Sequence, residues 1–250
     1  MIHYRRRKPI KVILLMLVVF VVMIGFNIIE HSDSRTLVAD DTSSEVSSQS
    51  DEALKKVTKV SSPSQTYRIA IDPGHGGSDP GAMGVSGAYE KEFNLSLAQV
   101  IYEVLEADPM FEPYMTREND EYIELNERAA MANAWNADAL ISIHANTYED
   151  STVTGTETIY RHEGSKALAE IIQRHLTQDF GLRDRGIKQE RMHVLSTAKM
   201  PAVLIEVGYL TNAEEEKLLR SSEGQELAAN AIVNGLKEYL MEMKSSDDPT

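Results

Sequence analysis

Two histidines of this 250-residue chain follow apolar, strand-like segments and could bind a metal ion or transfer protons. His75 lies in "IAIDPGHGGSDPG" (69–81), where closely spaced glycines and prolines predict a rigid loop that orients one side chain. His144 lies in "ISIHAN" (141–146) and ends a second apolar run. In α/β sheets the functional groups lie just beyond the carboxyl ends of strands, so the two imidazoles are candidates for one site. The alternative is that each histidine is structural.

Carboxylates could complete such a site. Glu206 interrupts the apolar run "PAVLIEVGYLTN", and a glutamate is almost never buried without a partner, so it predicts a nearby cation or a role in proton transfer. Glu90 and Glu92 begin an amphipathic segment, where their charge also favours the helix dipole, so a structural role is equally open to them.

The chain has no cysteine, so only His, Asp or Glu could ligate a metal, and disulfides and a catalytic thiol are excluded. Two histidines and one glutamate form a known zinc hydrolase site, in which the fourth coordination position is left for water. A further carboxylate can act as the base for that water and as the acid for the leaving group.

The elements that must position these residues alternate in type. Strand-like runs are expected at 67–71, 111–116, 139–143, 155–160, 192–196 and 202–207, and helical spacing of apolar residues at 93–105, 168–180 and 227–243. This alternation predicts an α/β fold with a central sheet covered by helices on both faces. The helix at 168–180 is expected to stop at Gly181.

The amino end has a different composition from the rest. Five basic residues within 1–11 precede an apolar run at 12–29, which favours a transmembrane anchor in 1–30 with a cytoplasmic N-terminus and the remainder outside the cell. A cleaved signal peptide is the competing interpretation, but no good small-residue cleavage site follows, and the nearest, at 37–39, is poor. A buried core helix would leave the charge asymmetry unexplained.

Residues 31–66 are rich in Ser, Thr, Asp and Glu and predict a flexible polar linker. The folded domain is expected at 67–244, followed by a short acidic tail at 245–250. The formal net charge of −14 argues against nucleic acid as a partner, because nucleic-acid binding needs clustered Lys and Arg.

Four segments in order resemble the zinc-dependent N-acetylmuramoyl-L-alanine amidases of the bacterial cell wall, the amidase_3 family. They are "IAIDPGHGGSDPGAMG", "YEKEFNLSLA", "ADALISIHAN" and "MPAVLIEVGYLTN". Shorter strings between them, including "MTREND", "LNERAAMAN", "GTETIY", "DRGIK" and "HVL", are also similar. The resemblance covers about residues 67–243.

The resemblance implies a mainly parallel six-stranded sheet flanked by helices and one Zn²⁺ held by His75, Glu90 and His144, with Glu206 as the catalytic residue. The choice of Glu90 over Glu92 rests on the family's Glu-Lys pair, here Glu90 and Lys91. The implied reaction is hydrolysis of the amide between N-acetylmuramic acid and the L-alanine of the stem peptide. The implied partners are peptidoglycan, the membrane through the N-terminal helix, and an undefined regulatory protein.

Two other functions stay open at this point. A different zinc-dependent wall peptidase, either a carboxypeptidase or an endopeptidase, could use the same ligand types. A catalytically silent, membrane-anchored module that binds the wall is the second alternative, although all four expected metal and catalytic residues are present.

Overall fold

A six-stranded sheet forms the centre of the computed structural model, which describes residues 66–247. The strands are β1 (Tyr67–Pro73), β2 (Phe111–Met115), β3 (Ala139–Asn146), β4 (Thr156–Tyr160), β5 (Asp184–Gln189) and β6 (Ala202–Tyr209). Their order across the sheet is β2-β1-β3-β6-β4-β5, and every neighbouring pair is parallel except β4 and β6. The expected mainly parallel, six-stranded α/β sheet is confirmed.

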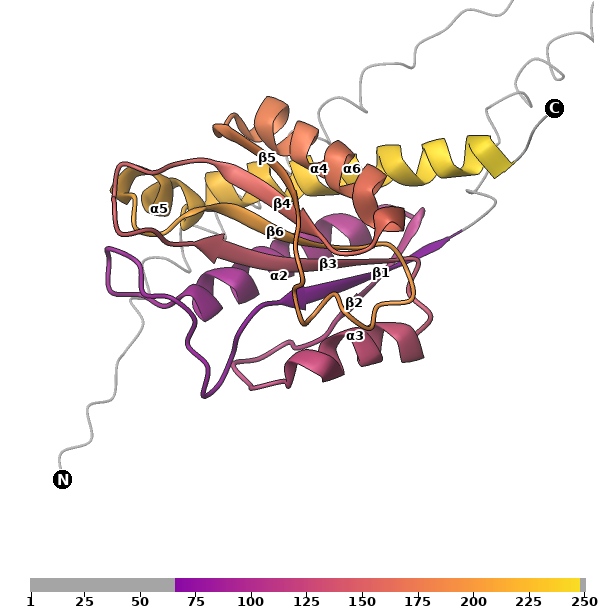
Figure 1. Cartoon of the computed structure of the whole chain (residues 1–250), viewed down its shortest axis with the longest axis horizontal. Coiled ribbons are helices and arrows are strands. Elements are labelled where there is room, and N and C mark those ends of the chain that lie inside the picture. The colour runs from indigo at the N-terminus through magenta and orange to yellow at the C-terminus, as the bar shows by residue number, and fades with distance from the viewer. Residues whose placement is uncertain (1–65, 248–250) are drawn as a thin grey trace, which may run out of the picture. The chain divides into compact units, whose positions relative to one another are not determined.

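Helices cover both faces of this sheet (Figure 1). Among the described residues they are α2 (Glu90–Glu106), α3 (Leu125–Ala134), α4 (Lys166–His175), α5 (Ala213–Leu219) and α6 (Ser222–Asp247). α2, α4 and α6 pack together over the larger hydrophobic core, and the alanines of α3 pack into the smaller core on the opposite face. A π-helical turn, Leu176–Phe180, extends α4 to the expected stop at Gly181, which has a φ of 81°.

The alternation of side chains along the strands decides which face carries the candidate site. Ile143 of β3 and Ile205 of β6 belong to the core beneath α2, α4 and α6. Leu140 and Leu204 belong to the opposite core, which packs against α3. Because successive residues of a strand point to opposite faces, His144 and Glu206 lie on the α3 side of the sheet.

One expected strand is wrong. Residues 192–196 form turns, although Val194 and Leu195 are buried in the core on the α3 side. The sixth strand is instead β5, whose sequence "DRGIKQ" is mostly polar because it forms the edge of the sheet. A short apolar run can fill a core from a turn, whereas an edge strand needs few apolar residues, so periodicity selected the wrong segment.

The expected anchor and linker, 1–30 and 31–66, lie outside the described residues apart from residue 66. Within residues 66–247 no helix combines the length and the apolar character needed to cross a bilayer. At the other end, α6 continues to Asp247 and so extends into the expected acidic tail at 245–250.

Candidate metal centre and active site

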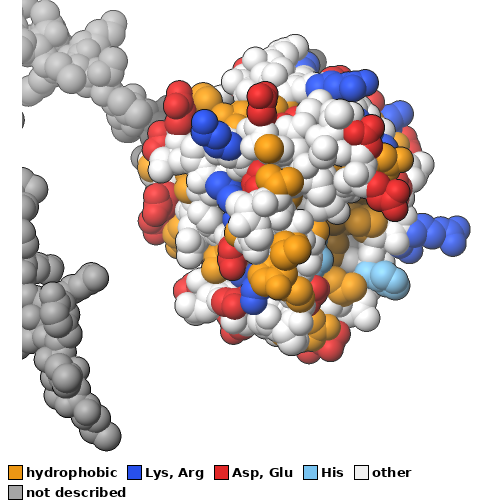
Figure 2. All heavy atoms as spheres, turned by 90° about the vertical axis from the view of Figure 1, so that its left-hand side faces the viewer, with side chains coloured by type: hydrophobic (Ala, Val, Ile, Leu, Met, Phe, Trp, Pro, Cys, Tyr) orange, Lys and Arg blue, Asp and Glu red, His pale blue; other side chains and the backbone are white. Residues whose placement is uncertain are grey.

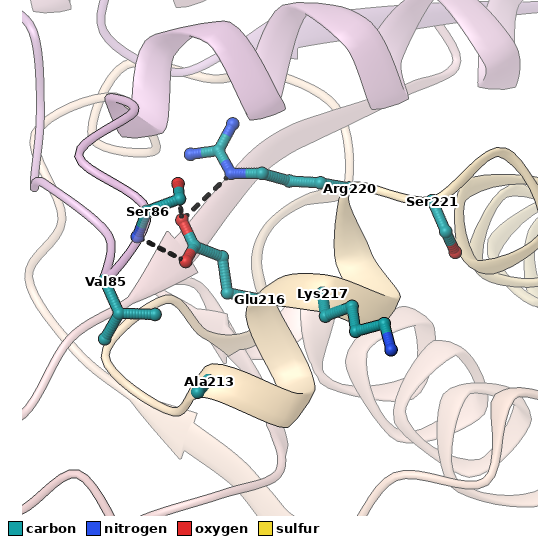
Figure 3. Close-up of a pocket in the computed structure, with 7 residues that line it drawn as sticks. All are labelled: Val85, Ser86, Ala213, Glu216, Lys217, Arg220 and Ser221. Carbon is teal, nitrogen blue, oxygen red and sulfur yellow. Dashed lines mark hydrogen bonds and ion pairs between the residues drawn. The ribbon is translucent and has the colours of Figure 1, made fainter.

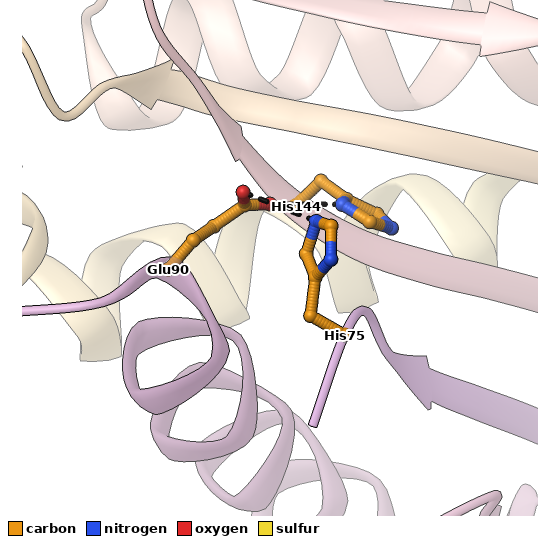
Figure 4. Close-up of side chains that lie close together, drawn as sticks. All are labelled: His75, Glu90 and His144. Atoms are coloured by element: carbon orange, nitrogen blue, oxygen red, sulfur yellow. Dashed lines mark hydrogen bonds and ion pairs between the residues drawn. The ribbon is translucent and has the colours of Figure 1, made fainter. Parts of the chain in front are cut away.

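Three of the four predicted site residues converge at the end of the sheet toward which β1 and β3 run (Figure 4). His75, Glu90 and His144 each offer one ligand atom, and these atoms lie within 4.8 Å of one another. His75 comes from the loop after β1, Glu90 is the first residue of α2, and His144 lies inside β3 near its end. The strand-end rule therefore identified both histidines, although β3 continues to Asn146.

The loop after β1 holds His75 in an unusual conformation. Its φ of 59° lies in the left-handed region, which residues other than glycine rarely adopt. Asp79 accepts a hydrogen bond from Nδ1 of the imidazole over 2.8 Å, which leaves Nε2 facing Oε2 of Glu90 at 3.1 Å. Such a carboxylate on the outer nitrogen fixes the tautomer and the orientation of a metal-binding histidine.

Gly74 shows why the loop is rich in glycine. A Cβ atom added at this position would lie 2.2 Å from Nε2 of His144, so any other residue would collide with the imidazole. The backbone at Gly74, just after β1, therefore lies against the ring of His144, and the two histidine rings have centroids 4.9 Å apart.

Glu90 is only 4% exposed and is held from several directions. Its Oε1 lies 2.9 Å from Nδ1 of His144 and accepts hydrogen bonds from the Asn94 side chain and the Ala145 backbone. Its Oε2 accepts a hydrogen bond from the Ala82 backbone. In contrast, Glu92 is exposed, so the structure places Glu90 and not Glu92 at the site.

The charges of the triad suit a cation. Burial alone would raise the pKa of Glu90 and lower that of His75, but the hydrogen bonds between the carboxylate and the imidazoles dominate. They lower the pKa of Glu90 well below its ordinary range and raise the pKa of His75 to about 9. The site thus stabilises Glu90 as a buried carboxylate with positive charge next to it. Two imidazole nitrogens and one carboxylate oxygen are also donor types that zinc prefers, so the residues fit this metal.

Glu206 lies on the neighbouring strand, with its Cα directly opposite that of His144 in the β3–β6 register. Its Oε2 atom is buried and has no hydrogen-bond partner among the described residues. The pKa of Glu206 is raised to about 7, chiefly by burial; the imidazole of His144 opposes the shift, and the carboxylates of Glu90 and Glu157 add to it. A carboxyl group with a pKa near neutrality can both take up and release a proton.

Two buried arginines support the loop that carries His75, and the sequence analysis did not single them out. Arg117 donates to the carbonyl oxygens of Pro73 and Gly74, and Arg128 donates to that of His75. Arg128 is also paired with the buried Asp72 at 2.9 Å. Both arginines occur in the strings "MTREND" and "LNERAAMAN", whose polar character gives no sign of burial.

The segment between His75 and Glu90 is also fixed by α5 (Figure 3). The buried Glu216 accepts hydrogen bonds from the backbone and the hydroxyl group of Ser86 over 2.8 and 2.7 Å, and from Nε of Arg220 over 3.0 Å. Arg220 in turn donates to the carbonyl oxygen of Tyr89. Ser86, Glu216 and Arg220 line a surface pocket of about 440 Å³ that contains none of the four site residues.

A family model described as N-acetylmuramoyl-L-alanine amidase, Amidase_3, matches residues 69–238. The chain belongs to this amidase family. It is 39% identical over 191 residues to the N-acetylmuramoyl-L-alanine amidase LytC of Bacillus subtilis (strain 168), covering 75% of this chain but only 38% of LytC. The likeness to LytC therefore concerns one part of that protein.

Two solved amidase structures show the same fold. The catalytic domain of CwlV, an N-acetylmuramoyl-L-alanine amidase from Bacillus (Paenibacillus) polymyxa, has 41% identity and a TM-score of 0.68, covering 70% of this chain and 98% of that one. The CwlD amidase from Clostridioides difficile, solved in complex with the GerS lipoprotein, has 33% identity and a TM-score of 0.66, covering 70% and 99%.

Figure 2 views the end of the amidase domain that faces left in Figure 1. Histidine side chains reach the surface there beside hydrophobic ones, and acidic and basic side chains are scattered over the same face. β1, β3 and β6 run toward this end of the sheet, and His75, His144 and Glu206 lie on or just after these strands.

Proposed function

We propose that this amidase domain hydrolyses the amide between N-acetylmuramic acid and the L-alanine of peptidoglycan stem peptides, using one Zn²⁺ held by His75, Glu90 and His144. The observation that carries the proposal is the position of Glu206. Its buried oxygen without a hydrogen bond lies on the strand next to the convergent triad. Among amidase relatives, the named activity is the same.

In this proposal neighbouring groups orient two of the three zinc ligands. Asp79 orients the imidazole of His75, and Asn94 with the Ala82 and Ala145 backbones orients the carboxylate of Glu90. Bound zinc would supply the Lewis acidity that makes water nucleophilic near neutral pH and polarises the scissile carbonyl. The close hydrogen-bonded setting holds the ligands in place before the metal binds.

Glu206 performs the proton transfers. As a carboxylate it accepts a proton from the attacking water, and as a carboxylic acid it then donates this proton to the departing α-amine of L-alanine. A pKa of about 7 leaves both forms accessible around neutral pH. The amine must be protonated as it leaves, because an amide anion is a very poor leaving group.

Digestion of purified peptidoglycan by the zinc-loaded full chain tests the reaction. The products should be stem peptides with a free L-alanine amino group and uncut glycan strands. New reducing sugar ends would identify a glycosidase, and free D-alanine would identify a carboxypeptidase. Either product without free L-alanine amines contradicts the proposal.

Metal analysis tests the ligand assignment separately. His75→Ala and His144→Ala should each abolish stoichiometric zinc binding, whereas Glu206→Gln should keep the zinc and lose hydrolysis by on the order of 100-fold or more. Full zinc occupancy in both histidine variants would refute the assignment. Loss of zinc in Glu206→Gln would instead make Glu206 a ligand.

For the cellular location, we propose that residues 12–29 remain as a membrane anchor with the amidase domain outside the cell. The basic residues before this apolar run support that orientation. Protease added to intact protoplasts should remove the domain from a protein that otherwise stays with the membrane. A mature soluble form that begins near Asp40 would contradict the anchor and indicate secretion after cleavage.

A regulatory protein partner is also proposed, and the complex of the related CwlD amidase with the GerS lipoprotein supports it. Purification of the full chain from membranes after mild cross-linking should yield one stoichiometric partner. Recovery of the chain alone, with full activity, would contradict this proposal.

A further inference from the structure

Buried polar atoms without hydrogen bonds gather on one side of Glu206. Four such side-chain atoms occur among the described residues, and three of them belong to Glu206, Glu157 and Arg185. The atoms of Glu157 and Arg185 belong to an ion-pair cluster with Lys188, whereas Oε2 of Glu206 has neither a hydrogen bond nor an ion pair, although buried polar groups are nearly always paired in folded proteins. The fourth atom belongs to Asn94, which contacts Glu90 within the triad.

These atoms lie on one face of the sheet. Glu157 of β4 is directly opposite Glu206 of β6 in the antiparallel register, so both side chains point to the same face. Lys188 of β5 is the register partner of Ile159, two residues beyond Glu157, and its ammonium group contacts Oε2 of Glu157. His144, Glu206, Glu157 and Lys188 thus form a row across four neighbouring strands.

Arg185 joins this row because the edge strand is irregular. Gly186 has a φ of 78°, and the β4–β5 register shifts between Thr156 and Thr158. Regular alternation of side chains is broken at this point, so Nε of Arg185 also approaches Oε2 of Glu157, at 3.8 Å. Its guanidinium group lies over the ring of Tyr209, 5.2 Å from the centroid.

The cluster has one positive charge more than Glu157 can neutralise. Lys188 and Arg185 share this single carboxylate, and their side chains remain 42% and 29% exposed. The hydrogen bond from Asn146 to Oε1 of Glu157, at 2.9 Å, holds the carboxylate in place beneath them. The two partly exposed cations, held by the Glu157 carboxylate, form a site for an anionic group, although the chain as a whole is acidic.

The direction of the proposed reaction tells which part of the substrate meets these cations. The leaving amine must face Glu206, so the stem peptide departs on the Glu206 side of the triad, over β4 and β5. We infer that Arg185 and Lys188 bind a carboxylate of the stem peptide, on the residue that follows L-alanine. This inference rests on the proposed amidase function and adds the substrate feature that the site selects.

The spacing agrees with this register. Neighbouring strands lie about 4.8 Å apart, and an extended peptide advances about 3.3–3.6 Å per residue. The charged groups of Arg185 and Lys188, which contact Glu157 on β4, therefore lie about one strand spacing from β6. An extended substrate peptide covers that distance in one to two residues. In the stem peptide this position belongs to the second residue, whose carboxyl group can be free or amidated.

Two muramoyl tripeptides that differ only at this group provide the test. In one, the D-glutamate after L-alanine has a free α-carboxylate, and in the other it is the carboxamide. The zinc-loaded full chain should favour the free acid by about tenfold in kcat/KM, because hydrogen bonds to charged groups are roughly that much stronger. The preference should fall as salt is added, since the cations are partly exposed.

Arg185→Gln and Lys188→Met should each reduce this preference to below threefold by lowering kcat/KM on the free acid alone. Arg185→Lys and Lys188→Arg should retain most of it. The exposed Arg191, mutated to Gln, is the matched control and should keep the tenfold preference. Zinc content and thermal unfolding of each variant show whether it is folded.

Equal losses on both substrates would give the two residues a purely structural role and overturn the inference. A wild-type preference near one at low salt would overturn it without any variant. In both cases release of L-alanine amines would still stand as evidence for the amidase reaction. If the wild-type chain released them from neither tripeptide, the proposed function would fail together with this inference.

Discussion

Replacing Glu206 by glutamine should stabilise the metal-free protein while it abolishes hydrolysis. The carboxylate has a buried oxygen without a hydrogen bond, and two other carboxylates, Glu90 and Glu157, lie close enough to raise its pKa. Ionised Glu206 therefore destabilises the folded state, and the proposed function requires it. A neutral amide of the same shape removes the buried charge and with it the ability to transfer protons.

The size of the effect follows from the pKa. A rise from 4.5 to about 7 corresponds to about 3 kcal/mol of unfavourable free energy for the ionised group. The amide of glutamine leaves its own donor unpaired, which costs about 1 kcal/mol. Glu206→Gln should therefore gain about 2 kcal/mol, or roughly 4–8 °C in the thermal midpoint of a domain of this size.

The pH dependence has a defined sign. The folded state binds the proton more tightly than the unfolded chain, so the cost of Glu206 is absent below pH 4.5 and is fully present above about pH 7. The advantage of Glu206→Gln should appear between these values. Thermal unfolding after chelation, at pH 4.5 and pH 8, measures it.

Glu170→Gln, an exposed substitution on α4, is the control and should change the midpoint little at either pH. A Glu206→Gln protein that is no more stable than wild type at pH 8 would refute the reasoning. So would a gain of the same size at both pH values, because a charge effect must disappear when the carboxyl group is protonated.

Three further results are expected. Asp79→Asn should weaken zinc binding by about 10- to 100-fold in chelator competition, because the imidazole of His75 loses its orienting carboxylate, and unchanged affinity would contradict that role. Arg128→Met should lower the free energy of unfolding in denaturant by about 3–5 kcal/mol, since the buried Asp72 loses its cationic partner and keeps only the hydrogen bonds from Thr116 and Ser142, and a loss below 1 kcal/mol would show that the pair is dispensable. Burial alone would lower the pKa of His175, but two carboxylates that contact its ring raise it, so its stabilising contribution is complete below pH 6.5 and is lost as the pH rises through the raised pKa. The stability difference between wild type and His175→Gln should shrink over that range, and a constant difference would exclude this ion pair.

The parts of the site that could be predicted from sequence are those where polar residues interrupt apolar strands. His75, His144 and Glu206 each follow or interrupt such a run, and the structure brings them to one end of the sheet. The choice between Glu90 and Glu92 could not be made from periodicity. Both lie in the first turn of the same helix. Only the way α2 packs against the sheet decides which of the two carboxylates points toward the histidines.

The polar surroundings of the site were harder to predict. Asp79 and Glu216 are charged residues in polar segments, where a sequence pattern indicates exposure, and Glu157 lies in the expected strand at 155–160, whose pattern does not show which face of the sheet it meets. Their roles come from tertiary contacts with residues far along the chain, such as the pairing of Glu157 with Lys188 and of Glu216 with Ser86. The periodicity of a single segment contains no information about such contacts.

Apolar periodicity also misassigned one strand. Residues 192–196 have the apolar content of a buried strand and pack into the core as turns. β5 was missed because an edge strand that carries Arg185 and Lys188 has little apolar surface to bury. α5, with the sequence "AEEEKLL", is likewise too short and too charged to give a helical pattern of apolar residues.

Hydrolysis of a defined muramoyl tripeptide in water enriched in ¹⁸O tests the central claim most directly. The zinc-loaded full chain should place one heavy oxygen in the lactyl carboxyl group of N-acetylmuramic acid and release an unlabelled peptide with a free L-alanine amine. Glu206→Gln should form neither product at a comparable rate while it retains zinc. Label in a carboxyl group of the peptide, or at the reducing carbon of the sugar, would show that a different bond is cleaved and would contradict the account.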